Sequence, residues 1–468
     1  MSPAVAIVGG GVSGLAAAHR LRALLGPAAA ITVLEQRDRI GGVLRTVDLA
    51  GVPYDVGAEA FLARRPEIPA LLAELGLADR QVAPTSAAPS VRAGGRTGPL
   101  PAGTLRGVPT SGARLDGLLS GAGAAAVAAE PDRALRWEPG ADVSLGGLLR
   151  ERFGDELADR LADPLLGGVY AGRVDALGLR ATVPELAAAL DAGAPSVTAA
   201  ADAAAPPPAP GGKRPGPVFG ALRGGYRELL DGLATASGAI VRRSTTVRAV
   251  ERLATGWRLV LRPTTASEAL DVDAVLLAVP APAAARLLAP VAPAAARGAG
   301  EIELASSVVV ALAYRPEDVA ALPPTSGVLI AADEPLRVKA VTHSSTKWDH
   351  LSPDWLVRLR ASLGRFGEAS CLQVDDAELV ARVRADLTAL AGITAVPVAV
   401  HVQRWGGGLP QYAVGHLDRV RTIAGELPPG LAVAGSALHG VGVPACVGTA
   451  QAAAERLAAH LLAPLDAH

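Results

Sequence analysis

A glycine-rich loop between a strand and a helix constrains the fold of this chain most strongly. Residues 4–9 form a short apolar run that ends in glycine, and residues 13–25 place their leucines and alanines on one helical face. A second apolar, β-branched run follows at 30–36. The order strand, helix, strand predicts a βαβ unit. Parallel strands joined in this way need helices on both faces of their sheet.

The loop itself carries the pattern of a dinucleotide-binding turn. Gly9, Gly11 and Gly14 occupy the G-x-G-x-x-G positions: the first allows a tight turn, the second a close approach of backbone to a pyrophosphate, and the third close helix packing. Glu35 ends the second strand about 20 residues further on, where a carboxylate can bind ribose hydroxyls. Glycines also mark plain turns, but this context favours dinucleotide binding.

The remaining pattern predicts an α/β protein, α+β overall. We expect a helix from Pro66 to Gly76 and then irregular chain to 98, mainly helix over 115–192, a helix within 218–237, antiparallel strands over 239–262, strands within 303–374, and a helix over 376–391. A strand and a helix close the chain. We expect them to share one sheet with the N-terminal βαβ unit, which makes the nucleotide domain discontinuous.

These elements divide into three units and a loop. A discontinuous Rossmann-like domain takes residues 1–63, 218–300 and 425–468, a mixed-sheet substrate domain takes 64–98 and 301–424, and a helical subdomain takes 99–191. The Pro/Ala/Gly-rich segment 192–217 is expected to form a surface loop without a packed element, because prolines lack an N–H donor and glycine and alanine offer little surface to bury.

Composition excludes several functions. With 44 Lys+Arg against 45 Asp+Glu and no basic block, a nucleic-acid partner is not expected. Cys371 and Cys446 are too few for a disulfide framework, and neither they nor the eight histidines show a metal-site pattern, so no metal is expected. A reducing, cytoplasmic location follows, since no signal peptide and no apolar run of spanning length is seen. Peripheral contact with a membrane stays open.

The segment after Glu35 indicates which dinucleotide is bound. "RDRIGGVLRT" resembles the R-x-G-G-x-x-x-T segment of amine-oxidase-like flavoproteins, in which Gly41 and Gly42 would admit the diphosphate and the flavin end of FAD. The resemblance therefore implies that the discontinuous domain binds FAD.

Further segments extend the resemblance over nearly the whole chain: "VPYDVGAEAFLARRPE", "DPLLGGVYAG", "VFGALRGGYRELLDGLA", "THSSTKWDH", "RWGGGLPQYAVGH" and "VAGSALHGVGVPACVGTAQAAAE". Together they resemble the protoporphyrinogen/coproporphyrinogen oxidase family. "EAFLARRPE" and the arginine-rich, alanine-rich composition look most like the actinobacterial members, which are coproporphyrinogen III oxidases.

The resemblance implies a set of FAD contacts, with the backbone of Val247 meeting the adenine. The implied cofactor-binding residues are Gly9, Gly10, Gly11, Val12, Ser13, Gly14, Glu35, Gln36, Gly41, Gly42, Val43, Gly57, Ala58, Glu59, Ala60, Val247, Trp405, Val441, Gly442 and Val443. Three positions depart from the family: Val43 replaces a cation of many relatives, Ala445 an acid, and Ser436 an Asn or Asp. These departures concern local flavin contacts and leave the glycine scaffold intact.

The implied reaction is the six-electron oxidation of a tetrapyrrole substrate, in three cycles, with O2 as acceptor and release of H2O2. The cofactor carries this chemistry, so no catalytic residue is named. Arginine suits the substrate's propionates, so Arg64 or Arg65 is a candidate clamp, with a solvated helix start as an equal alternative. Lys347 is a weaker candidate, and Tyr170 either lines the cavity or packs in the core. Transient contact with the next haem-pathway enzyme is also implied.

Three alternatives stay open. The substrate could be protoporphyrinogen IX, which has two vinyl groups in place of two propionates. The chain could be another flavin enzyme of this fold, an amine oxidase or a desaturase, although 3% aromatic residues are few for the aromatic cage of amine oxidases. It could also bind a tetrapyrrole without redox turnover.

Overall fold

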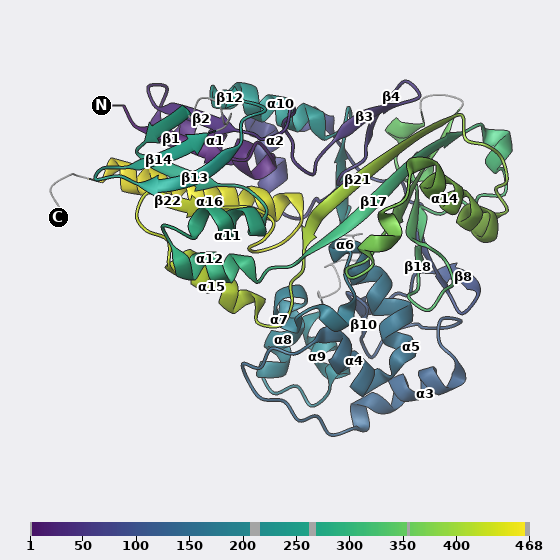
Figure 1. The fold of residues 1–468 in the computed structure, drawn as a ribbon. Helices are drawn as coiled ribbons and strands as arrows, with labels where there is room; N and C mark the ends of the chain where they lie inside the picture. The colour runs from purple at the N-terminus through teal and green to yellow at the C-terminus, as the bar shows by residue number, and fades with distance from the viewer. Residues whose placement is uncertain (1, 206–215, 262–267, 353–355, 464–468) are drawn as a thin grey trace.

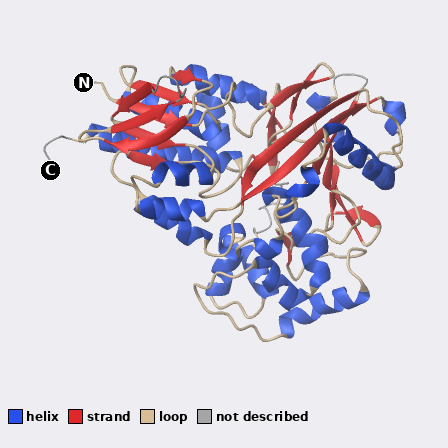
Figure 2. Ribbon diagram, viewed as in Figure 1, coloured by secondary structure: helices blue, strands red, loops and turns tan. Residues whose placement is uncertain are grey.

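Three units of the fold surround one central region of the molecule (Figure 1). The computed structural model describes residues 2–205, 216–261, 268–352 and 356–463. The N-terminal and C-terminal segments lie together at one end, two long strands run through the middle, and a group of helices lies below them (Figures 1 and 2). The boundaries of three domains stay a prediction.

A five-stranded parallel sheet forms the first unit, and it confirms that the two ends of the chain share one sheet. Its order is β12 (Ile240–Arg242), β2 (Ala30–Leu34), β1 (Ala4–Val8), β16 (Ala274–Leu277) and β22 (Leu431–Val433). The expectation of antiparallel strands over 239–262 is wrong for β12, which pairs in parallel with β2. β12 directly follows α10 (Tyr226–Ser237) and reaches the sheet edge beside β2 in the same direction, so it is not part of a hairpin.

Alternating side chains of β1 explain how both faces of this sheet are covered. Val5 and Ile7 pack on one helical layer, and Ala6 and Val8 pack on the opposite layer. The first layer contains α1 (Val12–Leu25), α2 (Glu67–Glu74), α10 (Tyr226–Ser237) and α16 (Val443–Leu462). The second contains β13 (Val247–Arg252), β14 (Trp257–Leu261), β15 (Glu268–Val272), α11 (Ala281–Leu288), α12 (Pro293–Gly300) and α15 (His416–Gly425).

A seven-stranded mixed sheet forms the second unit. Its order is β21 (Ala399–Pro410), β17 (Leu304–Tyr314), β20 (Val357–Leu363), β19 (Val338–His343), β18 (Gly327–Ile330), β7 (Pro89–Ala93) and β8 (Arg96–Pro99). Helix α14 (Asp376–Ala391), as predicted, packs its Leu379 and Val383 on one face. The expectation of irregular chain up to residue 98 is wrong, because β7 and β8 form a hairpin around Gly94 and Gly95, both with positive φ.

Small hairpins and short strand pairs lie outside the two large sheets. They are β3 (Thr46–Leu49) with β4 (Val52–Asp55); β11 (Phe219–Leu222) with β5 (Phe61–Leu62) and β6 (Gln81–Val82); and β9 (Thr104–Leu105) with β10 (Val108–Pro109). The β9–β10 pair packs against the helices of the third unit. A short helix, α13 (Ser344–Lys347), follows β19. No helix in the described ranges is long and apolar enough to cross a bilayer.

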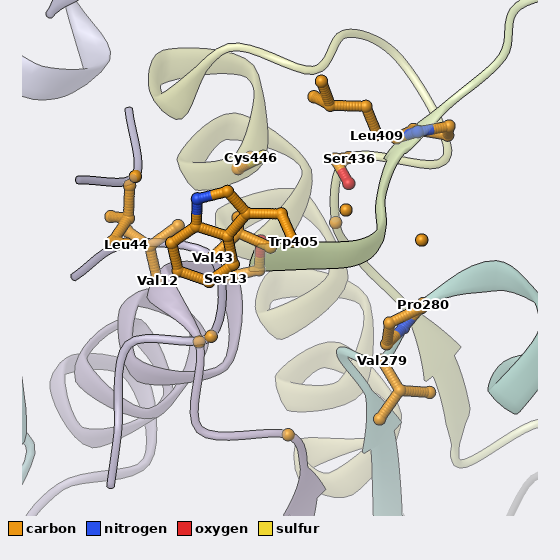
Figure 3. Close-up of a pocket in the computed structure, with 18 of the residues that line it drawn as sticks. Val12, Ser13, Val43, Leu44, Val279, Pro280, Trp405, Leu409, Ser436 and Cys446 are labelled. Atoms are coloured by element: carbon orange, nitrogen blue, oxygen red, sulfur yellow. The ribbon is translucent and has the colours of Figure 1, made fainter. Parts of the chain in front are cut away.

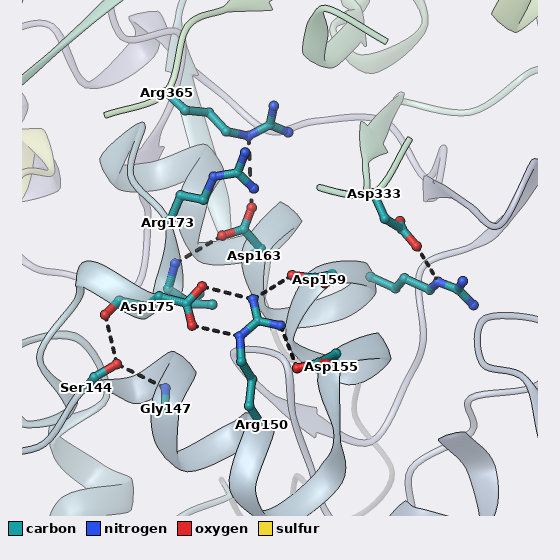
Figure 4. Close-up of polar contacts among 12 residues, drawn as sticks. Ser144, Gly147, Arg150, Asp155, Asp159, Asp163, Arg173, Asp175, Asp333 and Arg365 are labelled. Atoms are coloured by element: carbon teal, nitrogen blue, oxygen red, sulfur yellow. Dashed lines mark hydrogen bonds and ion pairs between the residues drawn. The ribbon is translucent and has the colours of Figure 1, made fainter. Parts of the chain in front are cut away.

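Helices form the third unit, as predicted for 115–192. They are α3 (Gly121–Ala129), α4 (Leu145–Phe153), α5 (Asp155–Leu157), a π-helical stretch over Ala158–Gly167, α6 (Gly168–Tyr170), α7 (Leu179–Thr182), α8 (Pro184–Asp191) and α9 (Val197–Ala204). Figure 4 shows the polar centre of this unit, where the Arg150 guanidinium contacts Asp155, Asp159 and Asp175 at 2.7–3.0 Å.

Helix α9 corrects the prediction that 192–217 holds no packed element. The Ser196 hydroxyl caps the helix, and Glu130 accepts the N–H groups of Val197 and Thr198 at 2.8 and 3.0 Å. Val197 and Ala200 are fully buried. Small side chains therefore pack here because a buried carboxylate holds the helix start. The proline-rich part, 206–215, lies outside the described residues.

Candidate active site

A cavity of about 510 Å³ lies where the three units meet. Its wall takes in the glycine loop, the loops 41–44 and 57–60, and the end of β16. The rest of the lining comes mainly from β17, β19, β20 and β21, from Gly168 and Val169 of the helical unit, and from the segment 434–446. Figure 3 shows Val12 and Ser13 at the start of α1, Trp405 on β21 and Cys446 on α16 around it. Residues far apart in the sequence thus form one site.

The glycine loop has the geometry of a phosphate-binding turn. Gly9 has φ +107°, and a Cβ there would lie 2.3 Å from the carbonyl oxygen of Ala278. A Cβ on Gly14 would lie 1.9 Å from the oxygen of Gly9, so α1 packs directly on the turn. A Cβ on Gly11 would meet only Gly42, at 3.9 Å. Within the described ranges no side chain caps α1, so its first N–H groups are free for an anion.

Glu35 connects this loop to the end of β2. Its carboxylate is 6% exposed and accepts the N–H of Gly10 at 2.7 Å and the N–H of Arg37 at 2.8 Å. Each oxygen keeps a second lone pair, and Glu35 lines the cavity. The residue is therefore both a brace for the loop and an acceptor for hydroxyl groups of a ligand.

Nearly all the sequence-predicted cofactor residues line this one cavity. Gly10 and Gly14 do not, since they contact Glu35 and Gly9 behind the wall. The others do: Gly9, Gly11, Val12, Ser13, Glu35, Gln36, Gly41, Gly42, Val43, Gly57, Ala58, Glu59, Ala60, Val247, Trp405, Val441, Gly442 and Val443.

Arg360 and Trp405 hold the loop 55–57 against the cavity. The Arg360 guanidinium donates to the carbonyl oxygens of Asp55, at 2.9 Å, and Gly57. The Trp405 indole N–H donates to the Val56 oxygen at 2.9 Å. A Cβ on Gly57 would lie 2.1 Å from the oxygen of Val43, so only glycine lets the two loops touch. Sequence reasoning missed Arg360; its signal is an arginine inside the apolar strand "VRLRASL".

Glu59 is the buried acid of this region. Burial would raise the pKa of Glu59, but the charges of Lys347 and Arg360 hold it below its ordinary value. Lys347 Nζ lies 3.4 Å from a Glu59 oxygen, which also accepts the Trp348 indole N–H. Glu59 lines the cavity with its charge already compensated.

The four predicted substrate residues do not line the cavity. Arg64 is exposed and Arg65 pairs with Glu67, as in the solvated alternative. Lys347 lies behind Glu59. Tyr170 is 7% exposed and packs on the Tyr412 ring, with 5.3 Å between centroids, as in its core-packing alternative.

Tyr412 fixes the loop that precedes α16. Its hydroxyl donates to the Ser436 oxygen at 2.6 Å and accepts the Gly440 N–H at 2.7 Å. The His416 ring stacks on Tyr412, with centroids 3.8 Å apart, and bonds through Nε2 to the Leu438 oxygen. Burial lowers the pKa of His416 to about 4, so the ring is neutral at physiological pH. These side chains position the backbone of 436–443 at the cavity.

Lys339 is a second cavity residue that sequence reasoning missed. The residue is 7% exposed, and its Nζ donates to the Gly364 oxygen at 2.9 Å. No local signal marks it, because alternation in "RVKAV" places Lys339 on the face opposite Val338 and Ala340, where a charged side chain is ordinarily in solvent.

The donor set fits a flavin dinucleotide. The uncapped start of α1 and the facing glycines suit a diphosphate, the Glu35 carboxylate suits ribose hydroxyls, and the apolar residues around Trp405 suit a flat ring.

Comparison with known proteins identifies the family. The profile of the flavin containing amine oxidoreductases matches residues 12–458. Coproporphyrinogen III oxidase of Mycobacterium tuberculosis H37Rv is 48% identical over 98% of both chains, and that of Bacillus subtilis is 28% identical over 96% of both. A crystal structure from Exiguobacterium, provisionally named a protoporphyrinogen oxidase, superposes with a TM-score of 0.85 and 30% identity over 98% of this chain and 99% of that one.

These matches agree with the resemblance found in the motifs. The chain is therefore a flavin-dependent oxidoreductase. It belongs to the flavin containing amine oxidoreductases and, among them, to the protoporphyrinogen/coproporphyrinogen oxidase family.

Proposed function

We propose that this protein uses FAD to oxidise coproporphyrinogen III to coproporphyrin III in haem biosynthesis, in the cytoplasm. The reaction removes six electrons, passes them to O2 and releases H2O2. The observation that supports this proposal most strongly is the 48% identity, over 98% of the chain, to a protein named coproporphyrinogen III oxidase. The cavity between the glycine loop and the seven-stranded sheet, which we call the substrate sheet, is consistent with it.

We propose that the predicted cofactor residues act as two groups. The glycine loop, Glu35 and Val247 would hold the ADP half of FAD, and residues 57–60, Trp405 and 441–443 would hold the flavin half. Bound FAD supplies an acceptor for hydride from the methylene bridges of the substrate.

The chain's own contribution is to bind, orient and exclude water. Val43, Val169 and Leu409 give the cavity apolar surface against which a macrocycle can pack. The 55–57 loop, held by Arg360 and Trp405, and the 436–443 loop, held by Tyr412, bring rigid backbone to the cavity. Such rigid positioning keeps the substrate in reacting geometry.

The test is to identify the extracted flavin and then supply substrates. Purified protein is denatured, and the released cofactor is separated by chromatography. The holoprotein is then given coproporphyrinogen III, protoporphyrinogen IX or amines, and porphyrin fluorescence, O2 uptake and peroxide are followed. We expect FAD, preference for coproporphyrinogen III, and about three peroxides per porphyrin, as six electrons require. Turnover of amines alone, or absence of flavin, would overturn the proposal.

Protoporphyrinogen IX is the second candidate substrate, because the superposed Exiguobacterium protein is provisionally named a protoporphyrinogen oxidase. The two substrates differ by two carboxylates. A higher kcat/KM for protoporphyrinogen IX in the same assay would favour it.

A further inference from the structure

An irregularity in the substrate sheet turns one lysine into the cavity. In the pairing of β19 with β20, Val338 lies opposite Leu363 and Ala340 opposite Ser362, so Lys339 is an extra residue at a β-bulge. A bulge bends its strand and redirects a side chain, and bulges recur beside functional sites. Here the redirected side chain lines the cavity wall.

This lysine is buried without an acidic partner. Lys339 Nζ donates to the Gly364 oxygen at 2.9 Å, and none of the described carboxylates lies within ion-pair distance. Arg365 and Arg360 repel its charge, and the Glu368 carboxylate is a weaker attraction. Glu368 is itself paired with Arg173 at 2.9 Å. A buried ammonium without a counterion is unfavourable, so a ligand anion is its natural partner.

The other cations of the cavity are already occupied or lie at the nucleotide end. Among the described residues, Arg37, Arg286, Lys339 and Arg360 line the wall. Arg37 and Arg286 are exposed, and they adjoin Gln36 and Leu287 near the glycine loop. Arg360 donates to two backbone oxygens. Arg360 also keeps unused N–H donors, but its guanidinium is fixed on the 55–57 loop, whereas the hydrogen bond of Lys339 goes to the Gly364 oxygen. Of these four, Lys339 is therefore the cation of the seven-stranded sheet that is least committed to protein partners.

We propose that Lys339 binds one propionate carboxylate of the tetrapyrrole substrate and so contributes to the choice of substrate. This inference rests on the proposed function. A substrate with more carboxylates gains from a buried cation, whereas a vinyl group leaves the ammonium unpaired.

The proposal also predicts a coupling between ligand and proton. Burial, with Arg365 and Arg360 nearby, lowers the pKa of Lys339 to about 7, so much of the free protein holds it neutral at pH 8. A carboxylate placed against Nζ favours the charged form and raises that pKa. Binding should therefore take up a proton, and affinity should fall as pH rises above 7.

The experiment measures binding of the product, coproporphyrin III, to the flavin-loaded protein. Fluorescence titration gives Kd from pH 6 to 8.5, and calorimetry at pH 8 in two buffers of different ionisation heat counts protons taken up. We expect Lys339→Met to weaken binding about tenfold or more at pH 7 and to abolish the uptake. Arg258→Met, which removes an exposed cation of the β14–β15 hairpin, should change neither.

Each outcome has one meaning. Wild-type protein that neither oxidises coproporphyrinogen III nor binds its product refutes the proposed function. Wild-type protein that binds without proton uptake, or Lys339→Met protein that binds equally well, refutes only the role of Lys339. A shift in the flavin absorption spectrum or reduction potential of Lys339→Met, with unchanged porphyrin affinity, also refutes it and assigns the lysine to the cofactor.

Discussion

Glu35 gives the most direct prediction for a single residue. Its two oxygens accept the N–H groups of Gly10 and Arg37. In Glu35→Gln, the amide oxygen accepts from one of these N–H groups, and the amide N–H₂ faces the other, which is also a donor. The glycine loop and a bound ligand therefore both lose a charge-assisted hydrogen bond. We expect the flavin Kd to rise about tenfold to hundredfold, measured by flavin fluorescence titration of the apoprotein. Asp38→Asn, at an exposed neighbour, is the control; equal affinity in Glu35→Gln would leave Glu35 only a structural role.

Lys339 gives a stability prediction whose sign can be worked out. Its pKa is ordinarily 10.5 and falls to about 7 in the folded chain. Between these two values the unfolded chain binds more protons than the folded chain. The cost to folding stability of burying the charged lysine is therefore fully present below pH 7 and fades as pH rises toward 10.5. Each unit of pKa shift corresponds to about 1.4 kcal/mol of stability, and changes in packing around methionine offset part of the gain. Lys339→Met should therefore stabilise the ligand-free protein at pH 6 by roughly 3 kcal/mol.

Denaturant unfolding of the wild type and Lys339→Met at pH 6 and 9 checks this. The difference should shrink at the higher pH. A variant that is less stable at pH 6 would show that the lysine already has a partner in the free protein. A gain in stability with a loss of ligand affinity is the signature of a residue kept for binding.

The loop before α16 is held mainly by one side chain, Tyr412. Tyr412→Phe leaves the Ser436 oxygen and the Gly440 N–H without their partner, which destabilises by about 1–3 kcal/mol. We expect faster amide hydrogen exchange over 436–442 and weaker flavin binding. Tyr170→Phe is the matched control, because it keeps the ring contact with Tyr412. Unchanged exchange in Tyr412→Phe would show that the His416 contact with Leu438 suffices to hold the loop.

Elements with local signals could be predicted from the sequence, and those fixed by distant partners could not. The glycine loop and helix α14 follow from periodicity and turn residues alone. Strand β7 joins the sheet through parallel pairing with β18, which lies more than 200 residues away. Helix α9 depends on the carboxylate of Glu130. The bulge at Lys339 depends on the register of β20, which no local pattern contains.

At the scale of the molecule, the cavity is predictable in part because the wall around the glycine loop is one local motif. The rest of the wall is assembled mainly from the seven-stranded sheet, the helical unit and the loop before α16. The two arginines that follow the 57–60 loop in sequence, Arg64 and Arg65, lie outside the cavity, whereas Lys339 and Arg360 are brought inside by sheet topology. Contact between the units decides which cations face the ligand.

A buried ion pair joins the helical unit to the end of the seven-stranded sheet. Asp163 is 2% exposed and lies 3.9 Å from Arg365, and it accepts the Val174 N–H at 3.0 Å (Figure 4). The Phe366 N–H donates to the Ala171 oxygen at 2.6 Å in the same region. Burial raises the pKa of Asp163, and Arg365 opposes that shift. Asp163 of this pair lies a few residues before Gly168 and Val169, which line the cavity.

Arg365→Met should uncouple the two units at neutral pH. The Asp163 carboxylate would be left buried without its counterion, a change that typically destabilises by about 3–5 kcal/mol. Because its pKa would rise further, protonation at pH 5 should recover part of the loss, and Asp163→Asn added to Arg365→Met should recover more, since the amide oxygen still accepts from Val174. Denaturant unfolding at pH 7 and 5, with limited proteolysis of residues 99–204, tests this. Equal stability of all variants at pH 7 would mean that the backbone bond of Phe366 and the apolar contacts hold the units together unaided.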